Sequence, residues 1–406
     1  MHLSRVQVPD FRVLKAIDIT FEPDYIPRIF PLGSLNGGGK STLLQLIFTL
    51  LHCAGDRSKH LFIQNLLYGY LPRTGAEPRT VAQFSLETGN RTYEIEFLVY
   101  RNSAIQTLLV SDLQSSSDLK DYYFSCVNYP SCSESEKSIV DRVQNYLGQH
   151  DLYYVTDYGE GVLLVQIEGL KTQEIEHLLA TVSPHFFLTA PSTQVFLFSS
   201  PASRRKLLRD IIRSEYENDL YKIEKDLDHF FPYRFLSVNL LITLFKLAQD
   251  KDFKKVIDNY QDVAPDKGLE QGHIQQGHVQ QLLTELSTIL GKGILIKPNA
   301  DLSEAIFELQ ESDRLIQLQP EDLSHGELKR LSIFMWLKYY QMQNAIVLMD
   351  EPEIAFHPDW QYQIVQDLLN WAPHNQYILA THSYEVCQAL TPGHVKELEI
   401  SPLIGS

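Results

Sequence analysis

Long apolar runs are missing from this 406-residue sequence, which argues against a membrane-spanning protein. The most apolar stretches, residues 43–51 and 186–198, are too short or too interrupted by polar residues to cross a bilayer. The first residues also lack the apolar core of a secretory signal. The sequence therefore predicts a cytoplasmic protein without membrane partners.

Cysteine and positive charge are both scarce. The four cysteines form no Cys-x-x-Cys pair, so neither a zinc knuckle nor a disulfide framework is indicated. Lys and Arg total 35 against 51 Asp and Glu, and the net charge of −16 disfavours non-specific adhesion to nucleic acid over most of the surface. A local basic patch is compatible with this balance. The hydrophobic content of 44% is that of a globular protein.

The spacing of apolar residues predicts an α/β chain interrupted by a helical middle. The predicted strands lie at residues 17–21, 27–32, 81–86, 93–99, 186–188, 294–296, 306–309, 315–318, 345–349 and 377–380. The predicted helices follow the glycines at 37–39, cover 203–230 and parts of 238–290, and begin after residues 323, 358 and 380. Residues 113–136 are polar and rich in Ser, and they are expected to form a surface loop.

A glycine-rich segment lies between the strand at 27–32 and the helix that follows it. Residues 34–42 read Ser-Leu-Asn-Gly-Gly-Gly-Lys-Ser-Thr, which fits the phosphate loop Gly-x-x-x-x-Gly-Lys-Ser/Thr except that Ser34 replaces the first glycine. In such a loop Lys40 would bridge the β- and γ-phosphates of ATP, and Ser41 would ligate Mg²⁺. A glycine turn before an ordinary helix is the alternative, and the Lys-Ser-Thr ending argues against it. The predicted nucleotide-binding residues are Asn36, Gly37, Gly38, Gly39, Lys40, Ser41 and Thr42.

Two adjacent carboxylates end the apolar strand at 345–349. A continuous apolar run is typical of a strand buried on both faces, and ligands bind at the carboxyl ends of such strands. Asp350 would suit the Mg²⁺ shell, and Glu351 would suit a general base that polarises the attacking water. A solvated loop start would carry the same residue pair, but Lys40 and Ser41 upstream favour the catalytic interpretation.

Three further segments occur in a characteristic order: Leu-Ser-His-Gly-Glu at 323–327, residues 354–357, and Thr-His-Ser at 381–383. With them the chain resembles the ABC-type ATPases, within the branch of structural-maintenance-of-chromosomes, RecF-like and overcoming-lysogenisation-defect proteins (AAA15/AAA21 type). The resemblance implies that Ser324 and Gly326 form the signature that covers the γ-phosphate bound by a second subunit. It also implies that His382 is the switch histidine, and that residues 354–357 communicate between the two sites.

Two fainter matches follow from the same resemblance. Asp-Phe-Arg at 10–12 resembles a segment whose arginine reaches the nucleotide, which implies a nucleotide contact for Arg12, although a plain strand edge would look the same. The family also places a glutamine near Mg²⁺ or the lytic water. Gln194 is the candidate, and Gln83 is the weaker alternative. Basic residues crowd positions 204–213 and could face phosphate, a partner's acidic surface or solvent.

The resemblance implies an ABC-type P-loop ATPase head with a mixed sheet, an antiparallel β subdomain and a helical insertion. The expected segments are an N-terminal lobe at 1–200, the insertion at 201–290, and a C-terminal lobe at 291–406 with the signature, Walker B and switch histidine. Because a signature helix cannot cover the phosphate of its own subunit, a homodimer or higher even-numbered homo-oligomer is expected.

The short helical middle resembles the ATPase subunits of the Septu and PARIS phage-defence systems, whose partners are nucleases. This predicts a Mg-ATPase that controls a separate effector in phage defence or DNA maintenance, with nucleic-acid binding left open. Two alternatives are the nucleotide-binding subunit of a membrane transporter and a nucleotide-dependent scaffold with little turnover. Against the transporter stand Glu327, where transporters usually carry Gln, and the long separation of Lys40 from Ser324.

Overall fold

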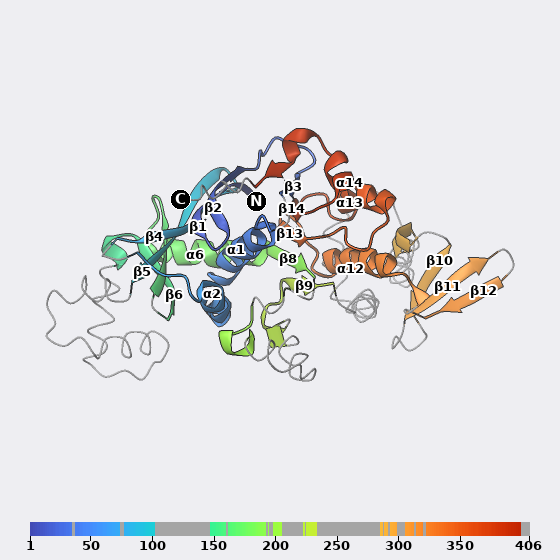
Figure 1. Ribbon diagram of the computed structural model, residues 1–406, viewed down its shortest axis with the longest axis horizontal. Helices are drawn as coiled ribbons and strands as arrows, with labels where there is room; N and C mark the ends of the chain where they lie inside the picture. Colours follow the sequence, from blue (N-terminus) through green and yellow to red (C-terminus); the bar gives the residue numbers. More distant parts are fainter. Residues whose placement is uncertain are drawn as a thin grey trace, which may run out of the picture. The chain divides into compact units, whose positions relative to one another are not determined.

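The computed structural model describes residues 1–34, 37–73, 77–101, 147–159, 161–191, 194, 198–204, 222–223, 225–233, 285–286, 288–290, 293–298, 305–311, 314–319 and 322–398. The chain forms two compact units (Figure 1). The first unit comprises Met1–Pro232, Asn344–Pro352 and His374–Ser406, and the second comprises Tyr233–Gln343 and Glu353–Pro373.

One sheet of the first unit is antiparallel. Its strands follow the order β2-β1-β4-β5-β7-β6. They are β1 (His2–Phe11), β2 (Leu14–Thr20), β4 (Arg79–Thr88), β5 (Arg91–Arg101), β6 (Leu152–Tyr158) and β7 (Gly161–Ile167). The β4–β5 hairpin pairs Thr88 with Arg91, and its turn contains Gly89 at φ +58°, a backbone conformation that glycine adopts at little cost.

The second sheet of this unit is parallel, in the order β15-β3-β14-β13-β8-β9. Its strands are β3 (Ile29–Gly33), β8 (Phe186–Ala190), β9 (Phe230–Pro232), β13 (Ile346–Asp350), β14 (Gln376–Ala380) and β15 (Lys396–Glu397). Every residue of β8, β13 and β14 is buried, as expected for strands that are covered on both faces.

Helix α1 (Lys40–Cys53) lies in the core of the first unit. It is buried on nearly its whole circumference, contacts β8, β13 and β14, and shares one apolar cluster with residues of both sheets. The other helical elements of the unit are η1 (Arg57–Lys59), α2 (His60–Leu67), α6 (Thr172–Val182), η2 (Ser183–His185), α14 (Tyr384–Gln388) and η5 (Pro392–His394). Among the described residues, no helix is long and apolar enough to cross a membrane.

The second unit has its own sheet and core. Strands β10 (Ile294–Pro298), β11 (Ala305–Glu311) and β12 (Arg314–Leu318) pair antiparallel in that order. Their apolar residues share a cluster with α12 (His325–Tyr339), and α12 contacts α13 (Pro358–Trp371).

A buried ion pair joins α12 to α13. Arg330 donates from Nε and Nη2 to the two carboxylate oxygens of Asp367, at 2.7 and 2.8 Å, and from Nη1 to the Ile289 carbonyl at 2.7 Å. The guanidinium also lies 5.1 Å from the ring centre of Trp360. The two ion-pair side chains are 11% and 6% exposed, so the loss of either leaves a buried charge without its counter-ion.

We therefore expect Arg330→Met to destabilise the second unit by about 3–5 kcal/mol. Denaturant unfolding followed by tryptophan fluorescence measures this, because all three tryptophans (Trp336, Trp360 and Trp371) belong to that unit. Arg5→Met is the matched control, since Arg5 makes the same forked contact to Asp18 at the surface of the first unit and contributes little there. Equal, small effects of the two changes would contradict the prediction.

The predicted α/β class with an antiparallel β subdomain is confirmed, and the first unit has one parallel and one antiparallel sheet where a mixed sheet was expected. All ten predicted strands are present with small shifts of their ends, as are the helices after residues 39, 323, 358 and 380. Strands β1, β6, β7, β9 and β15 and helices α2 and α6 were not predicted. The expected loop at 113–136, and most of the helical insertion at 201–290, lie outside the described residues.

Candidate nucleotide site

The glycine-rich segment connects β3 to α1. Gly37 and Gly39 have φ values of +80° and +83°, which side-chain-bearing residues rarely adopt. A Cβ atom on Gly39 would also lie 2.6 Å from Leu14 Cδ2, so glycine is required there by space as well as by conformation. Gly38 is buried, and the predicted residue Asn36 lies outside the described residues. The segment is thus a tight turn that opens directly onto a helix N-terminus.

The side chain of Lys40 is folded back onto this turn. Its Nζ donates to the carbonyl oxygen of Ser34 at 3.0 Å and to Ser34 Oγ at 3.1 Å, and the residue is only 5% exposed. Ser34 occupies the place of the motif's first glycine, and in this structure it positions the lysine. An ammonium held at the mouth of a glycine turn can bind the phosphates of a nucleotide.

Four side chains form a hydrogen-bonded chain next to the turn. Ser41 Oγ donates to Asp350 Oδ1 at 3.0 Å, and Gln194 Nε2 donates to the other oxygen of Asp350. Gln45, one turn further along α1, donates to Gln194 Oε1 at 2.5 Å. Two of the three predicted Mg²⁺ ligands, Ser41 and Gln194, therefore each lie within hydrogen-bond distance of the third, Asp350. Hydroxyl, carboxylate and amide oxygens are ligands that suit Mg²⁺.

The topology explains why residues so distant in sequence meet. β3, β14, β13 and β8 are consecutive parallel strands, so their carboxyl ends share one edge of the sheet. The glycine turn follows β3, Asp350 ends β13, and Gln194 comes soon after β8. His382 follows β14 by two residues, and its side chain is exposed.

Glu351 has an unusual backbone. Its φ is +50°, a strained conformation for a residue with a side chain, and its N–H donates to the Ala380 carbonyl at 2.8 Å across to β14. Residues held in such conformations cluster at active sites, where neighbouring structure fixes them. The strain lies directly after Asp350 and supports a functional role for the Glu351 carboxylate.

Arg12 is held at the end of a neighbouring helix, and its predicted contact with the nucleotide stays a prediction. Its Nη2 donates to the carbonyl of Leu66 at 2.6 Å, and Arg204 Nη2 donates to the carbonyl of Asn65 at 2.7 Å. Both arginines thus bind the carboxyl end of α2, where cations are favoured. Burial lowers the pKa of Arg12, and the positive charge of Arg204 lowers that pKa further.

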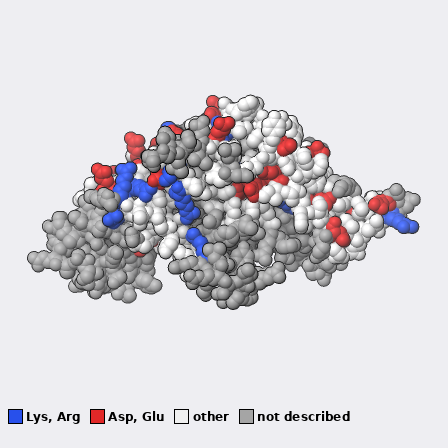
Figure 2. Space-filling view, in the orientation of Figure 1, with Lys and Arg blue, Asp and Glu red and all other residues white. Residues whose placement is uncertain are grey.

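The surface charge is unevenly distributed. Figure 2 shows Lys and Arg side chains gathered in a stripe on one face, so a local basic patch exists on a chain with a net charge of −16. Of the basic residues predicted at 204–213, only Arg204 lies among the described residues, and its guanidinium is occupied by the carbonyls of Ser199 and Asn65.

The predicted signature residues begin α12 in the second unit. Ser324 caps the helix: its Oγ accepts from the Glu327 N–H at 3.2 Å, while the Glu327 carboxylate accepts from the Ser324 N–H at 2.8 Å. A Cβ on Gly326 would lie 2.6 Å from the Ala355 carbonyl oxygen, so glycine lets the loop after Asp350 approach the helix closely. Residues 354–357 and the signature are therefore in contact within one unit.

Gln83, the alternative to Gln194, lies elsewhere in the first unit. It lines a polar cavity on the antiparallel sheet together with Glu94, Glu96, Asp151 and Glu168. Gln194, which contacts Asp350, is therefore the better placed of the two. Sequence reasoning missed Ser34 as the partner of Lys40 and Gln45 as the partner of Gln194. The departure of Ser34 from the glycine of the motif was the signal for the first; the second has no signal in the sequence.

Comparisons with known proteins assign the chain to a family. Residues 171–388, more than half of the chain, match the AAA_21 family, described as "AAA domain, putative AbiEii toxin, Type IV TA system". The match contains Gln194, Asp350 and His382 and begins after the glycine turn. Among curated proteins, the "Retron Vc95 probable ATPase" of Vibrio cholerae serotype O1 biovar El Tor is 47% identical over 52 residues, which are 13% of this chain and 10% of the relative.

Solved structures of structural-maintenance-of-chromosomes (SMC) heads are similar over most of the chain. The SMC head domain from Thermotoga maritima is 11% identical, with a TM-score of 0.42 over 96% of this chain and 92% of the other. An SMC head bound to the C-terminal winged-helix domain of ScpA is 12% identical, with a TM-score of 0.40 over 96% and 93%. The family match is the finding that assigns the chain, and it confirms the AAA21-type membership predicted from the motifs: the protein belongs to the AAA_21 family of AAA-domain proteins.

Proposed function

We propose that the protein binds Mg-ATP at the carboxyl edge of its parallel sheet and hydrolyses it. The observation that carries the proposal is the convergence of Ser41, Asp350 and Gln194 beside the glycine turn. Lys40 would bind the β- and γ-phosphates, and Ser41, Asp350 and Gln194 would hold Mg²⁺. Mg²⁺, when bound, would supply charge to neutralise the phosphates, and these three residues would fix its position.

In this proposal Glu351 acts as the general base. Glu351 directly follows Asp350, the proposed Mg²⁺ ligand, at the end of β13. Its backbone is fixed there by the hydrogen bond from its N–H to the Ala380 carbonyl. A carboxylate within reach of a water next to the γ-phosphate can accept the proton as that water attacks. His382, at the end of the neighbouring strand β14, would contact the γ-phosphate.

The direct test is phosphate release from ATP by the purified chain, with Mg²⁺ and with excess EDTA. We expect turnover only with Mg²⁺, because the metal must neutralise the phosphate oxygens before attack. ATP turnover that is equal in both conditions, or that is absent with Mg²⁺, would refute the proposed hydrolysis.

The role of Gln194 gives a matched pair of variants. Gln194→Ala removes a ligand next to Asp350, so we expect turnover to fall on the order of tenfold to a hundredfold and the Mg²⁺ requirement to rise, as when a partner of a bound metal is lost. Gln83→Ala changes the same residue type on the antiparallel sheet and should leave both quantities unchanged. ATP turnover of both variants, measured over a range of Mg²⁺ concentrations, tests this assignment. If Gln83→Ala lost turnover and Gln194→Ala did not, the role would belong to Gln83.

We further propose that two copies close around ATP and control a separate effector. The signature Ser324–Gly326 supports this, because in ABC-type ATPases this segment covers the nucleotide of a second subunit. A role in defence against phage, with an effector such as a nuclease, follows from the resemblance of the short helical middle to the ATPase subunits of the Septu and PARIS systems. Co-purification of the chain with the product of its neighbouring gene, with and without ATP, tests the effector; nucleic acid as a further ligand is tested by binding measured over a range of salt.

A further inference from the structure

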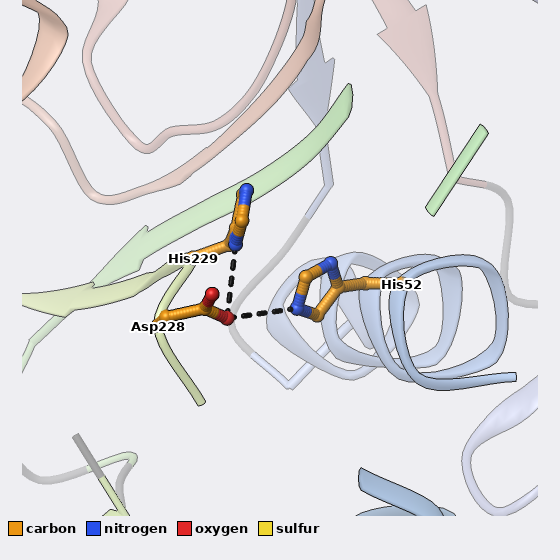
Figure 3. Close-up of side chains that lie close together, drawn as sticks. All are labelled: His52, Asp228 and His229. Atoms are coloured by element: carbon orange, nitrogen blue, oxygen red, sulfur yellow. Dashed lines mark ion pairs between the residues drawn. The ribbon is translucent and has the colours of Figure 1, made fainter. Parts of the chain in front are cut away.

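Two histidines and an aspartate meet at the far end of α1. His52 lies in the last turn of α1, and Asp228 and His229 directly precede β9 (Figure 3). Asp228 Oδ1 lies 3.5 Å from His52 Nε2 and 3.0 Å from His229 Nδ1, and the three ligand atoms all lie within 4.8 Å of one another. Segments far apart in sequence thus present two imidazoles and one carboxylate to a common point.

The hydrogen bond on the other side of the His52 ring orients it as a metal ligand. Nδ1 lies 2.9 Å from the Ser183 carbonyl, which can only accept, so Nδ1 carries the proton and Nε2 keeps its lone pair. A ring nitrogen that donates to a carbonyl while the other faces a metal is the usual arrangement of histidine ligands.

A cation already occupies the centre of the cluster. Lys59 Nζ lies 2.7 Å from Asp228 Oδ1 and 3.0 Å from His52 Nε2. The ammonium also lies 3.5 Å from Asp56 Oδ2, so Lys59 can pair with a second carboxylate if its side chain moves. The cluster therefore has the charge and the lone pairs to bind one cation, and the lysine competes for that place.

We propose that His52, Asp228 and His229 bind a divalent transition metal of the zinc type, with Lys59 displaced toward Asp56. Tetrahedral ligands at about 2.0–2.1 Å from zinc are about 3.3–3.4 Å apart, close to the two measured separations from the Asp228 oxygen. Two nitrogen ligands and one oxygen favour zinc-like ions over Mg²⁺ or Ca²⁺, which prefer oxygen. Asp228 is 52% exposed, which leaves an entry path and room for water as the fourth ligand.

This site is separate from the candidate Mg²⁺ site. His52 follows Lys40 by twelve positions along α1, a distance of about 18 Å along the helix. A metal here would tie the end of α1 to the segment that leads into β9. We therefore assign it a structural role: it would hold the helix that follows the glycine turn against the parallel sheet.

The experiment is metal binding to the full-length, EDTA-stripped protein without nucleotide. Calorimetry with Zn²⁺ should give one equivalent, Co²⁺ should give the visible absorption of a tetrahedral site, and Zn²⁺ should raise the melting temperature. Lys59→Met should bind Zn²⁺ at least about tenfold more tightly because it removes the competing ammonium, whereas Asp228→Asn and His229→Gln should each weaken binding about tenfold to a hundredfold.

Two controls separate this site from others. His60→Gln changes a half-buried histidine beside the cluster, whose ring contacts the Ala54 carbonyl, and it should leave Zn²⁺ binding unchanged. Asp350→Asn disables the candidate Mg²⁺ site and should also retain the Zn²⁺ equivalent, so a failure of the ATPase proposal does not affect this result. Absence of Zn²⁺ and Co²⁺ binding in both the wild type and Lys59→Met, or binding indifferent to Asp228→Asn, would overturn the metal site and leave an ion-pair cluster.

Discussion

Replacement of Glu351 by Gln should reduce ATP turnover by about a hundredfold to ten-thousandfold while ATP binding is kept. The amide has the size of the carboxylate but cannot accept the proton of the attacking water, and loss of a general base has this magnitude. Because Asp350, Ser41 and Gln194 stay in place, the Mg-ATP complex should still form. Phosphate release and equilibrium ATP binding, measured on the same preparation, separate the two effects.

The same variant should accumulate an ATP-bound dimer or larger even-numbered assembly. If hydrolysis opens the assembly, blocking the chemical step traps the closed state. Light scattering with and without Mg-ATP measures the mass directly. A mass that stays that of the monomer in Glu351→Gln with Mg-ATP would contradict the dimer and leave hydrolysis untouched.

Glu397→Gln is the matched control for both measurements. Glu397 lies on β15 of the same parallel sheet, and its side chain is exposed. It should turn over ATP as the wild type does. Wild type and Glu351→Gln with equal, negligible turnover would instead favour a nucleotide-dependent scaffold.

The sequence predicted those parts of the fold whose signals are local. β13 and β14 are continuous apolar runs, and strands covered on both faces require such runs. β6 and β7 were missed although Gly159, at φ +55°, marks the turn between them. β7 pairs with β5, which precedes it in the chain by the long stretch from residue 102 to 146, and β6 pairs with β7 at the edge of the sheet. The pairing of β7 with β5 has no local signature in the sequence.

The candidate site was predicted mainly from the order of its motifs along the sequence. Ser41 and Asp350 were predicted to share a Mg²⁺ site, and their side chains are hydrogen-bonded because parallel topology brings a phosphate loop and a strand-end carboxylate together. Gln194 was selected by its place after β8, and the structure brings it to Asp350. The contact of Arg12 with the end of α2 was not foreseen, since it depends on where a neighbouring helix ends.

The His52 cluster could not have been predicted at all. Its residues come from α1 and from the segment before β9, and no spacing rule relates them. Metal-binding motifs can be recognised in a sequence when the ligands lie at a fixed spacing on one helix or one turn. Here the ligands are brought together by β8, which packs against α1 on one side and pairs with β9 on the other.

Lys40→Met should weaken ATP binding on the order of a hundredfold. The lysine provides a charge-assisted bond to the phosphates, worth about 1.5–3 kcal/mol for each such hydrogen bond, and a thioether provides none. The Lys40 ammonium is hydrogen-bonded to Ser34, which lies on the turn itself. Loss of the ammonium should therefore affect the turn and not the distant core. Calorimetric titration of the protein with ATP in the presence of magnesium measures the change in ATP affinity.

Lys396→Met provides the matched comparison for Lys40→Met. Lys396 is a largely buried lysine on β15 of the parallel sheet. Its ammonium donates to the Gly393 carbonyl at 2.9 Å and pairs with Glu22. Its replacement should lower the melting temperature without changing ATP affinity, whereas Lys40→Met should change affinity with a smaller effect on melting. If both variants bind ATP as the wild type does, the glycine turn is not a phosphate loop, and the proposed nucleotide site fails with it.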